Sequence, residues 1–285
     1  MKPIQICLWF ADQAEEAANL YTSLFEGSAI GTIARYGKAG AQVSGQAEGS
    51  VMTVELELAG TRLLGLNGGP HFRFNPTMSL FVGCESEAEI DRLWKKLPKN
   101  VRMELQKYPF APKYGWCEDR YGMNWQLILG PRRQKISPAL LFANQRYGKV
   151  EEAIRFYISL FPGSEIEKIA RDERTGAVLH SAFTLAGQSF VAMEGPLPKE
   201  FDFSPAMSFV VPCASQEEID DIWGKLSAVP EAERCGWLQD KFGVSWQVVH
   251  QDWGKLISEA SPQKREQILS AIFKMKKPVL KLIPS

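Results

Sequence analysis

Apolar and polar residues follow two different periods along the first quarter of the chain. Residues 4–10 form an apolar run of strand length, and residues 13–25 carry apolar side chains three and four positions apart, which predicts an amphipathic helix. Residues 50–58 (SVMTVELEL) alternate with period two, as a half-buried strand does. Further strands are predicted near 29–36 and 61–67, with LAGTRL forming a short hairpin turn. The predicted order is therefore βαβββ.

The same order begins again in the second quarter. Residues 78–82 predict a strand, residues 86–97 predict a helix, and short strands follow, the last at 124–129. Four such quarters fill the chain, which predicts an α+β fold of tandem modules, each of paired βαβββ units with a half-closed mixed β-sheet. The concave face of such a sheet is the natural place for a pocket.

Three segments of the first half recur in the second half. EEAANLYTSLFEGSAI recurs as EEAIRFYISLFPGSEI, MSLFVGCESEAEIDRLWKKL as MSFVVPCASQEEIDDIWGKL, and DRYGMNWQ as DKFGVSWQ. The spacing between the copies shrinks along the chain, so loops differ in length while the elements persist. The sequence therefore predicts two homologous modules, residues 1–131 and 137–285, joined by a basic, proline-bounded linker at 132–136.

The end of the second module has a helix signature of its own. Ser261 is a candidate N-cap, and Pro262 fits the first helical position. Lysines gather at the C-terminal end, where the helix dipole favours cations. We expect a packing helix, and the alternative is a basic helix that binds a partner. The apolar stripe of this helix consists of Ile268, Leu269, Ile272 and Phe273.

The amino-acid composition gives no support for a nucleic-acid-binding, membrane or secreted protein. The 33 basic and 33 acidic residues balance, which gives no electrostatic reason to expect a nucleic acid or an anionic membrane as partner. No segment approaches the roughly 20 apolar residues that span a bilayer, and the N-terminal apolar run is too short for a signal peptide. The five cysteines are odd in number and show no CxxC spacing, which is typical of reduced thiols in a cytoplasmic protein.

Taken together, the paired βαβββ units and four motifs resemble a known family. The motifs are CLWF…AEEAANLYTSLF, LNGGPHF, MSLFVGC and GWCEDRYGMNWQLIL. They are similar to the PhnB-like branch of the vicinal oxygen chelate superfamily, which includes glyoxalase and bleomycin-resistance proteins. The resemblance covers nearly the whole chain, once in each module. It implies the glyoxalase/bleomycin resistance/dihydroxybiphenyl dioxygenase-like fold, with a tandem chain that pairs with itself as an intramolecular pseudo-dimer or forms a homodimer.

Members of this branch are often labelled 3-demethylubiquinone-9 3-methyltransferase-like. A methyltransferase of the doubly wound kind needs a Gly-rich loop after a parallel strand to cradle its cofactor. In this chain LNGGP follows a predicted strand but leads to Pro70 and another strand. We therefore do not expect methyltransferase activity.

The resemblance also implies positions for a divalent metal. In metal-using relatives, His or Gln on the first strand, two Glu and a further His hold the ion on the concave sheet. In the first module these positions fall at Gln5, Asn67, Thr77 or Met78, and Gln126, of which Gln126 replaces a carboxylate. Neutral amides are poor ligands for a hard cation. We expect the metal centre to be incomplete, although a divalent metal at an atypical site stays possible.

The second module offers little more for a metal. Leu141 is aligned with Gln5, Gln247 repeats Gln126, and Glu194, aligned with Asn67, is the one carboxylate of the set. His180 and His250 could approach each other, but a histidine in the core or on the surface is commoner than a ligand pair.

The remaining conspicuous residues have structural and functional interpretations. The Asp and Gly of DRYGMNWQ and DKFGVSWQ predict a tight turn, in which Asp caps the loop and Gly takes a positive φ. The tryptophans near these motifs either fill the core or line a pocket. The Gly-rich segment after Tyr36 is either a mobile lid or an exposed hairpin loop. Cys84 and Cys213 have no identifiable catalytic partner and are expected to be buried thiols.

These observations predict a small-molecule binding protein with metal-free concave pockets for a partly aromatic or polar organic compound. One alternative is a metal-dependent isomerase, lyase or dioxygenase with an atypical site built on Gln5, Gln126 or Glu194. Another is a partner-binding protein that uses the basic C-terminal helix. The candidate ligand-binding residues are Gln5, Asn67, Trp116, Trp125, Gln126, Glu194, Trp237, Trp246 and Gln247.

Overall fold

The computed structural model describes residues 2–284. The first half contains β1 (Gln5–Phe10), α1 (Ala14–Leu24), β2 (Ala29–Arg35), α2 (Lys38–Ser44), β3 (Val51–Leu58), β4 (Thr61–Asn67), β5 (Met78–Cys84), α3 (Glu87–Trp94), β6 (Asn100–Tyr108), β7 (Ala111–Glu118) and β8 (Asn124–Leu129). The second half contains β9 (Ile136–Phe142), η1 (Asn144–Arg146), α4 (Val150–Leu160), β10 (Glu165–Arg171), β11 (Val178–Leu185), β12 (Gln188–Glu194), β13 (Met207–Cys213), α5 (Gln216–Leu226), η2 (Pro230–Ala232), β14 (Trp237–Gln239), β15 (Ser245–His250), α6 (Trp253–Glu259), α7 (Pro262–Phe273) and η3 (Leu280–Leu282).

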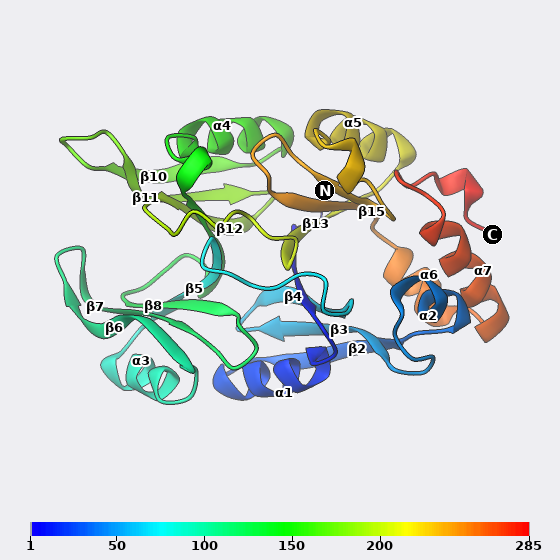
Figure 1. The fold of residues 1–285 in the computed structure, drawn as a ribbon, viewed down its shortest axis with the longest axis horizontal. Helices are drawn as coiled ribbons and strands as arrows, with labels where there is room; N and C mark the ends of the chain where they lie inside the picture. Colours follow the sequence, from blue (N-terminus) through cyan, green and yellow to red (C-terminus); the bar gives the residue numbers. More distant parts are fainter. Residues whose placement is uncertain (1, 285) are drawn as a thin grey trace.

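The strands form two mixed sheets, which confirms the predicted α+β class (Figure 1). The seven-stranded sheet, named sheet A, has the order β14-β15-β13-β1-β4-β3-β2. The eight-stranded sheet, named sheet B, has the order β10-β11-β12-β9-β5-β8-β7-β6. Each sheet therefore joins one unit from the first half of the chain to one from the second half. Among the described residues, three units have the predicted βαβββ order, and the fourth, β13-α5-β14-β15, has one strand fewer. The two units of one half lie in different sheets, a pairing that the repeats alone do not specify.

Equivalent antiparallel strand pairs join the units. In sheet A, β1 pairs with β13, with Gln5 opposite Val210. In sheet B, β9 pairs with β5, with Ser137 opposite Phe81. Four consecutive residues of β1 and five of β5 are paired across these junctions, so the halves of the chain share their sheets rather than merely touching.

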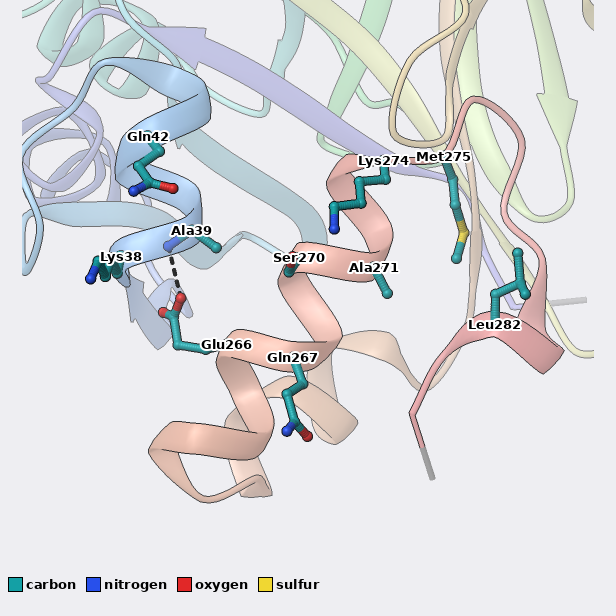
Figure 2. A pocket seen from close by; sticks show the side chains of 10 residues that line it. All are labelled: Lys38, Ala39, Gln42, Glu266, Gln267, Ser270, Ala271, Lys274, Met275 and Leu282. Atoms are coloured by element: carbon teal, nitrogen blue, oxygen red, sulfur yellow. Dashed lines mark hydrogen bonds between the residues drawn. The ribbon is translucent and has the colours of Figure 1, made fainter.

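Two helices lie where the pattern of apolar residues gave none. α6 precedes the C-terminal helix, and α2 occupies the Gly-rich segment that was predicted as a lid or an exposed loop. α2 packs against α7, and the backbone N–H of Ala39 donates to Glu266 Oε2 at 2.7 Å (Figure 2). A side chain at Gly37 would collide with the Glu266 carboxylate. The C-terminal helix therefore holds this segment in place.

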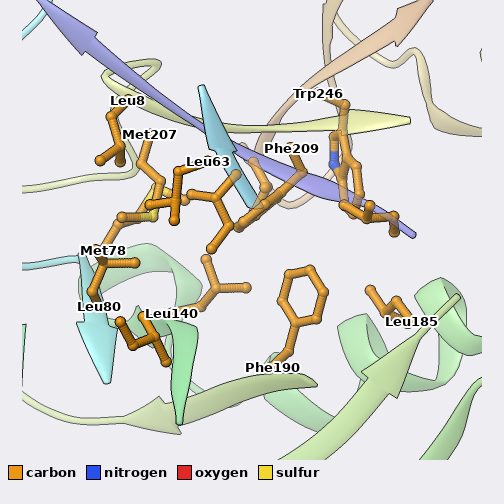
Figure 3. Packing of buried hydrophobic residues seen from close by; sticks show 14 of the residues in the cluster. Leu8, Leu63, Met78, Leu80, Leu140, Leu185, Phe190, Met207, Phe209 and Trp246 are labelled. Carbon is orange, nitrogen blue, oxygen red and sulfur yellow. The ribbon is translucent and has the colours of Figure 1, made fainter. Parts of the chain in front are cut away.

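The hydrophobic core lies between the two sheets and beneath α1, α3, α4 and α5. Leu8 and Met207 from sheet A face Met78 and Leu140 from sheet B (Figure 3). We call the core-facing side of each sheet its inner face and the opposite side its outer face. Because side chains alternate along a strand, the residues next to these core positions point to the outer faces.

Asp119 and Asp240 fix the last hairpin of a unit in each half. Asp119 Oδ1 accepts from the backbone N–H groups of Tyr121 and Met123, at 2.8 and 3.0 Å. Its Oδ2 accepts from Tyr21 of α1 at 2.7 Å and from Trp125 Nε1 at 2.9 Å. One buried carboxylate thus ties turn, helix and strand together, and Gly122 has the positive φ of 85° that the turn needs. The predicted turn is confirmed.

Asp240 repeats this arrangement with four donors of its own. Its Oδ1 accepts from the backbone N–H groups of Phe242 and Val244, and its Oδ2 accepts from Tyr157 of α4 and from Trp246 Nε1. Gly243 has the matching φ of 87°.

We predict that Asp119→Asn lowers the free energy of unfolding by about 1–3 kcal/mol, because each carboxylate oxygen accepts from two donors and at least one of them loses its acceptor whichever oxygen the NH2 group replaces. Asp240→Asn should have a similar cost, since its carboxylate has the same four kinds of donor. Urea unfolding measures the change, with the exposed Asp221→Asn as the control. Variants at Asp119 and Asp240 as stable as the control would contradict this role for the motif.

Candidate functional site

Each outer face carries one row of paired residues that includes a repeated glutamine. In sheet A the row runs Trp237, Gln247, Val210, Gln5 across four neighbouring strands. The structure therefore brings together predicted site residues from opposite ends of the chain, and Gln5 and Trp237 are both half-buried.

In sheet B the equivalent row runs Trp116, Gln126, Phe81, Ser137. Trp116 and Gln126 are buried on this face. The predicted site residues on this face, Trp116 and Gln126, both come from the first half of the chain, and Ser137 from the second half joins their row without having been predicted.

The register of the second half differs from the alignment on which the sequence prediction rested. Ser137, not Leu141, lies at the position equivalent to Gln5, because Cys7 lies opposite Ser208 as Ala139 lies opposite Ser79. Leu141 is instead equivalent to Trp9. The cause is a longer connection between first strand and helix in the second half, where η1 is inserted.

Trp125 and Trp246 lie on the inner faces and not on a pocket floor. Both are almost fully buried in the core, and Trp125 stacks on Phe25 as Trp246 stacks on Phe161. A ligand on an outer face would not reach them. Of the two interpretations open to these tryptophans, the structure supports core packing.

Asn67 and Glu194 hold the starts of helices. Asn67 Oδ1 accepts from the backbone N–H of Ala14 at 2.8 Å, and its Nδ2 donates to the carbonyl of Val51. Glu194 accepts from the backbone N–H groups of Val150 at 3.3 Å and Val178 at 2.8 Å. The contacts to Ala14 and Val150 satisfy N–H groups at the starts of α1 and α4 that have no partner within the helix. Both side chains are therefore engaged in the fold rather than presented to a ligand.

The repeated glutamines are also hydrogen-bonded within the protein. Gln126 Oε1 accepts from Tyr114 Oη at 2.6 Å, and its Nε2 donates to Ser79 Oγ at 2.8 Å. Gln247 Nε2 donates to Ser208 Oγ at 3.0 Å. The amides are fixed in orientation by these bonds and present neutral groups to the outer faces.

The donors beside the repeated glutamines do not fit a divalent metal. Within residues 2–284, no group of three His, Cys, Asp or Glu side chains lies together as a possible metal site. On sheet A, burial raises the pKa of the Cys7 thiol to about 11, so it stays protonated beside Gln247 and Ser208. Amides, hydroxyls and a protonated thiol lack the charge that divalent ions need. His180 and His250 lie in different sheets, so they do not form a pair of metal ligands.

The C-terminal segment covers part of the outer face of sheet A. Trp253 of α6 with Ile268 and Ile272 of α7 form an apolar cluster against Val249 of β15 and Cys235. The amides of residues 235 and 236 donate to the carbonyls of residues 275 and 276, at 2.8 Å each. Because α7 also contacts α2, the segment connects the two edges of sheet A (Figure 1). The expected packing role of this helix agrees with the burial of its apolar stripe.

A shallow groove of about 670 Å³ remains along the seam between α2 and α7 (Figure 2). Its walls include the polar side chains of Lys38, Gln42, Gln267 and Lys274 beside the apolar side chains of Met275 and Leu282. It lies away from the repeated glutamines of both sheets and shares none of their residues.

We predict that Ile268→Asp releases the C-terminal segment while the two sheets stay folded, because it places a charge in the cluster around Trp253. Hydrogen exchange should accelerate at the amides of Cys235 and Gly236, which this segment protects. The exposed neighbour Gln267→Asp is the control and should leave exchange unchanged. Equal protection in both variants would show that the segment is not held by this cluster.

The outer face of sheet B is apolar and strongly curved. Phe81, Trp116, Leu141 and Val191 form a single cluster with Tyr114 at its side. The rings of Phe81 and His180 lie 5.9 Å apart although β9 and β12 separate their strands. In a flat sheet, three strand spacings would separate the backbones of β5 and β11 by about 14 Å. The face is therefore concave, and its half-buried rim consists of Met103, Tyr108, Ile128, Met193 and Leu197.

Arg132 and His180 introduce polar chemistry at this concave face. The Arg132 guanidinium lies 4.6 Å from the centre of the Phe81 ring. Both of its terminal nitrogens lie 3.4 Å from His180 Nε2. A guanidinium can only donate, so Nε2 accepts and the imidazole proton lies on Nδ1. Sequence analysis missed Arg132 because it lies in the linker, where basic residues are usually solvated.

Burial, together with the charges of Arg132 and Lys168, lowers the pKa of His180 from 6.5 to about 4. Between pH 6.5 and pH 4 the imidazole is therefore protonated in the unfolded chain and neutral in the folded protein. The free energy of unfolding falls as the pH falls from about 6.5 to 4. We predict that His180→Gln removes about 1–2 kcal/mol of the stability loss between pH 7 and pH 4.5. Urea unfolding at the two pH values measures this difference, with the exposed His71→Gln as control. Parallel pH profiles for wild type and His180→Gln would contradict the buried neutral imidazole.

The two cysteines that end β5 in sheet B and β13 in sheet A are inert thiols. Burial raises the pKa of Cys84 and of Cys213 to about 12, so neither supplies a thiolate near neutral pH. The prediction of buried thiols is confirmed.

Two mixed sheets built from three βαβββ units and one βαββ unit define a glyoxalase-type fold of the vicinal oxygen chelate class. A glyoxalase I mutant from Zea mays has a TM-score of 0.60 at 9% identity, covering 89% of this chain and 94% of that one. A dioxygenase-like protein from Bacillus subtilis, titled a putative dioxygenase, has a TM-score of 0.52 at 11% identity, covering 94% and 90%. At such identities the likeness concerns the fold alone.

The chain belongs to the family described as 3-demethylubiquinone-9 3-methyltransferase, whose profile matches residues 2–128 and 134–249. A PhnB protein of Bacillus cereus, titled a putative 3-demethylubiquinone-9 3-methyltransferase, is 40% identical, covering 46% of this chain and 98% of that one, with a TM-score of 0.41. The tandem, two-module PhnB-like assignment is confirmed. No curated protein matches the chain. Among residues 2–284, none of the helices has the length and apolar character needed to cross a membrane.

Proposed function

We propose that the protein binds a small, partly aromatic organic molecule at the outer face of sheet B without a bound metal. The observation that carries this proposal is the composition of that concave face. A floor of Phe81, Trp116, Leu141 and Val191 lies within a half-buried rim, and the fixed amide of Gln126 lies among them. Apolar concave surfaces with a few oriented polar groups are typical of small-molecule sites.

Sheet A is a weaker candidate for the same role. Its outer face is partly covered by α6 and α7, and Trp9 and Trp237 contact each other across it with ring centres 5.9 Å apart. We therefore compare this face with the proposed site on sheet B and do not propose it as the primary site. Its candidate residues are Gln5, Trp237 and Gln247. The two faces differ in sequence, and within residues 2–284 sheet A has no counterpart of β6.

The neutral donors of both faces support binding without a metal. The family name describes a methyl transfer, but the loop after β4 does not resemble a cofactor cradle. Gly68 lets the Trp9 ring approach, since a Cβ there would lie 2.0 Å from the ring, and Trp9 Nε1 donates to the carbonyl of Gly69. This loop thus has a packing role, and we do not assign methyltransferase activity.

Two matched substitutions test the location. Met193 and Leu66 occupy equivalent places, since Met193 pairs with Leu141 as Leu66 pairs with Trp9. Planar aromatic compounds that raise the melting temperature of the wild type should lose this effect in Met193→Trp, which fills the rim of sheet B. They should keep it in Leu66→Trp. Retained binding in Met193→Trp, or loss in Leu66→Trp alone, would contradict the assignment to sheet B.

The metal-free part of the proposal has a separate test. Compounds that bind should do so equally in EDTA and in the presence of Mn²⁺ or Ni²⁺. Stoichiometric ion content in untagged protein, with ligand binding that depends on the ion, would instead support the metal-dependent alternative.

A further inference from the structure

A half-buried cation lies at the edge of the concave face of sheet B. The Arg132 guanidinium lies over Phe81, and the Arg132 side chain packs so closely on Gly83 that a Cβ there would lie 2.5 Å from Arg132 Cγ. Gly83 and Phe81 are two residues apart on β5 and share the outer face. The side chain is thus positioned by the floor of the proposed site, not extended into solvent.

The charge of Arg132 is not matched by a carboxylate in direct contact. None of the ion pairs formed within residues 2–284 involves Arg132. The charge of the Glu167 carboxylate acts on Arg132, but Glu167 is paired with Arg133, whose Nη1 lies 3.0 Å from Glu167 Oε1. Its nearest polar partner is the neutral imidazole of His180. A guanidinium has five N–H donors, so several remain available to a ligand.

A second cation reinforces the positive field at this place. Lys168 lies opposite Ala182, which has the same orientation as His180 on β11, and its charge acts on the His180 ring. The immediate surroundings of the imidazole therefore hold two cations and an aromatic ring. This combination suits a planar anion that can stack on an aromatic ring and pair with a guanidinium.

We infer that the ligand of this face carries a carboxylate or a similar planar anionic group, which Arg132 binds beside the Phe81 ring. This inference rests on the proposed function and adds the charge class of its ligand. Sheet A does not repeat the surroundings of Arg132, since Val210 and Pro212 of β13 lie at the positions equivalent to Phe81 and Gly83 of β5. The anion preference therefore belongs to sheet B alone.

Matched pairs of compounds test this charge preference. Benzoate, salicylate and naphthoate are titrated against benzamide, salicylamide and naphthamide by calorimetry or saturation-transfer NMR. The carboxylates should bind the wild type more tightly than their amides. Arg132→Gln should weaken carboxylate binding about 10- to 100-fold, the range of a charge-assisted hydrogen bond, and leave amide binding unchanged.

Arg133→Gln is the matched control, because Arg133 is the adjacent residue and forms exposed ion pairs with Glu165 and Glu167. It should bind carboxylates as the wild type does. Arg132→Lys keeps the charge but loses the planar fork, so it should restore part of the affinity. Melting temperatures of all variants show whether each one is folded.

The possible results separate this inference from the proposed function. Equal binding of acids and amides, or carboxylate binding unaffected by Arg132→Gln, would overturn the anion preference and leave the aromatic site in place. If no member of any pair binds saturably, both the anion preference and the proposed site are contradicted. Selective loss of carboxylate binding in Arg132→Gln supports both.

Discussion

The antiparallel pairing of β1 with β13 and of β5 with β9 is the constraint on which the rest of the structure depends. These two ladders place one unit from each half of the chain in every sheet. They place Gln5 in one row with Gln247 in sheet A, and they place Phe81 in the same sheet as Leu141 and His180 in sheet B. Each outer face is therefore a composite of both halves, and neither half alone can form one.

The outer faces of sheets A and B differ because different segments of the chain follow equivalent strands in the two sheets. The C-terminal helices follow β15, which belongs to sheet A, and they cover part of that outer face. The linker joins β8 to β9, which belong to sheet B, and it delivers Arg132 to the other face. Because of this connectivity, helices cover part of the outer face of sheet A and Arg132 lies at the outer face of sheet B, although both sheets are built from repeats of one unit.

The sequence predicted the elements well because local patterns determine them. Period-two and helical spacing located β1 to β5 and their helices within a few residues, and the Asp–Gly motif predicted its own turn. The candidate site was harder to predict, since it depends on which strands pair and in which register. A longer loop before α4 moved Leu141 off the position of Gln5, and α2 formed because α7 packs on it. Arg132 gave no periodic signal, because its environment is created by residues distant in sequence.

The most direct test of this account is methyl NMR of the intact protein during titration with naphthoate. The account predicts saturable shifts at Leu141, Val191 and Met193 on sheet B, with the methyl signals of Leu66 and Val210 on sheet A unchanged. Shifts at Leu66 and Val210 instead, or equal shifts on both faces, would contradict a single composite site on sheet B.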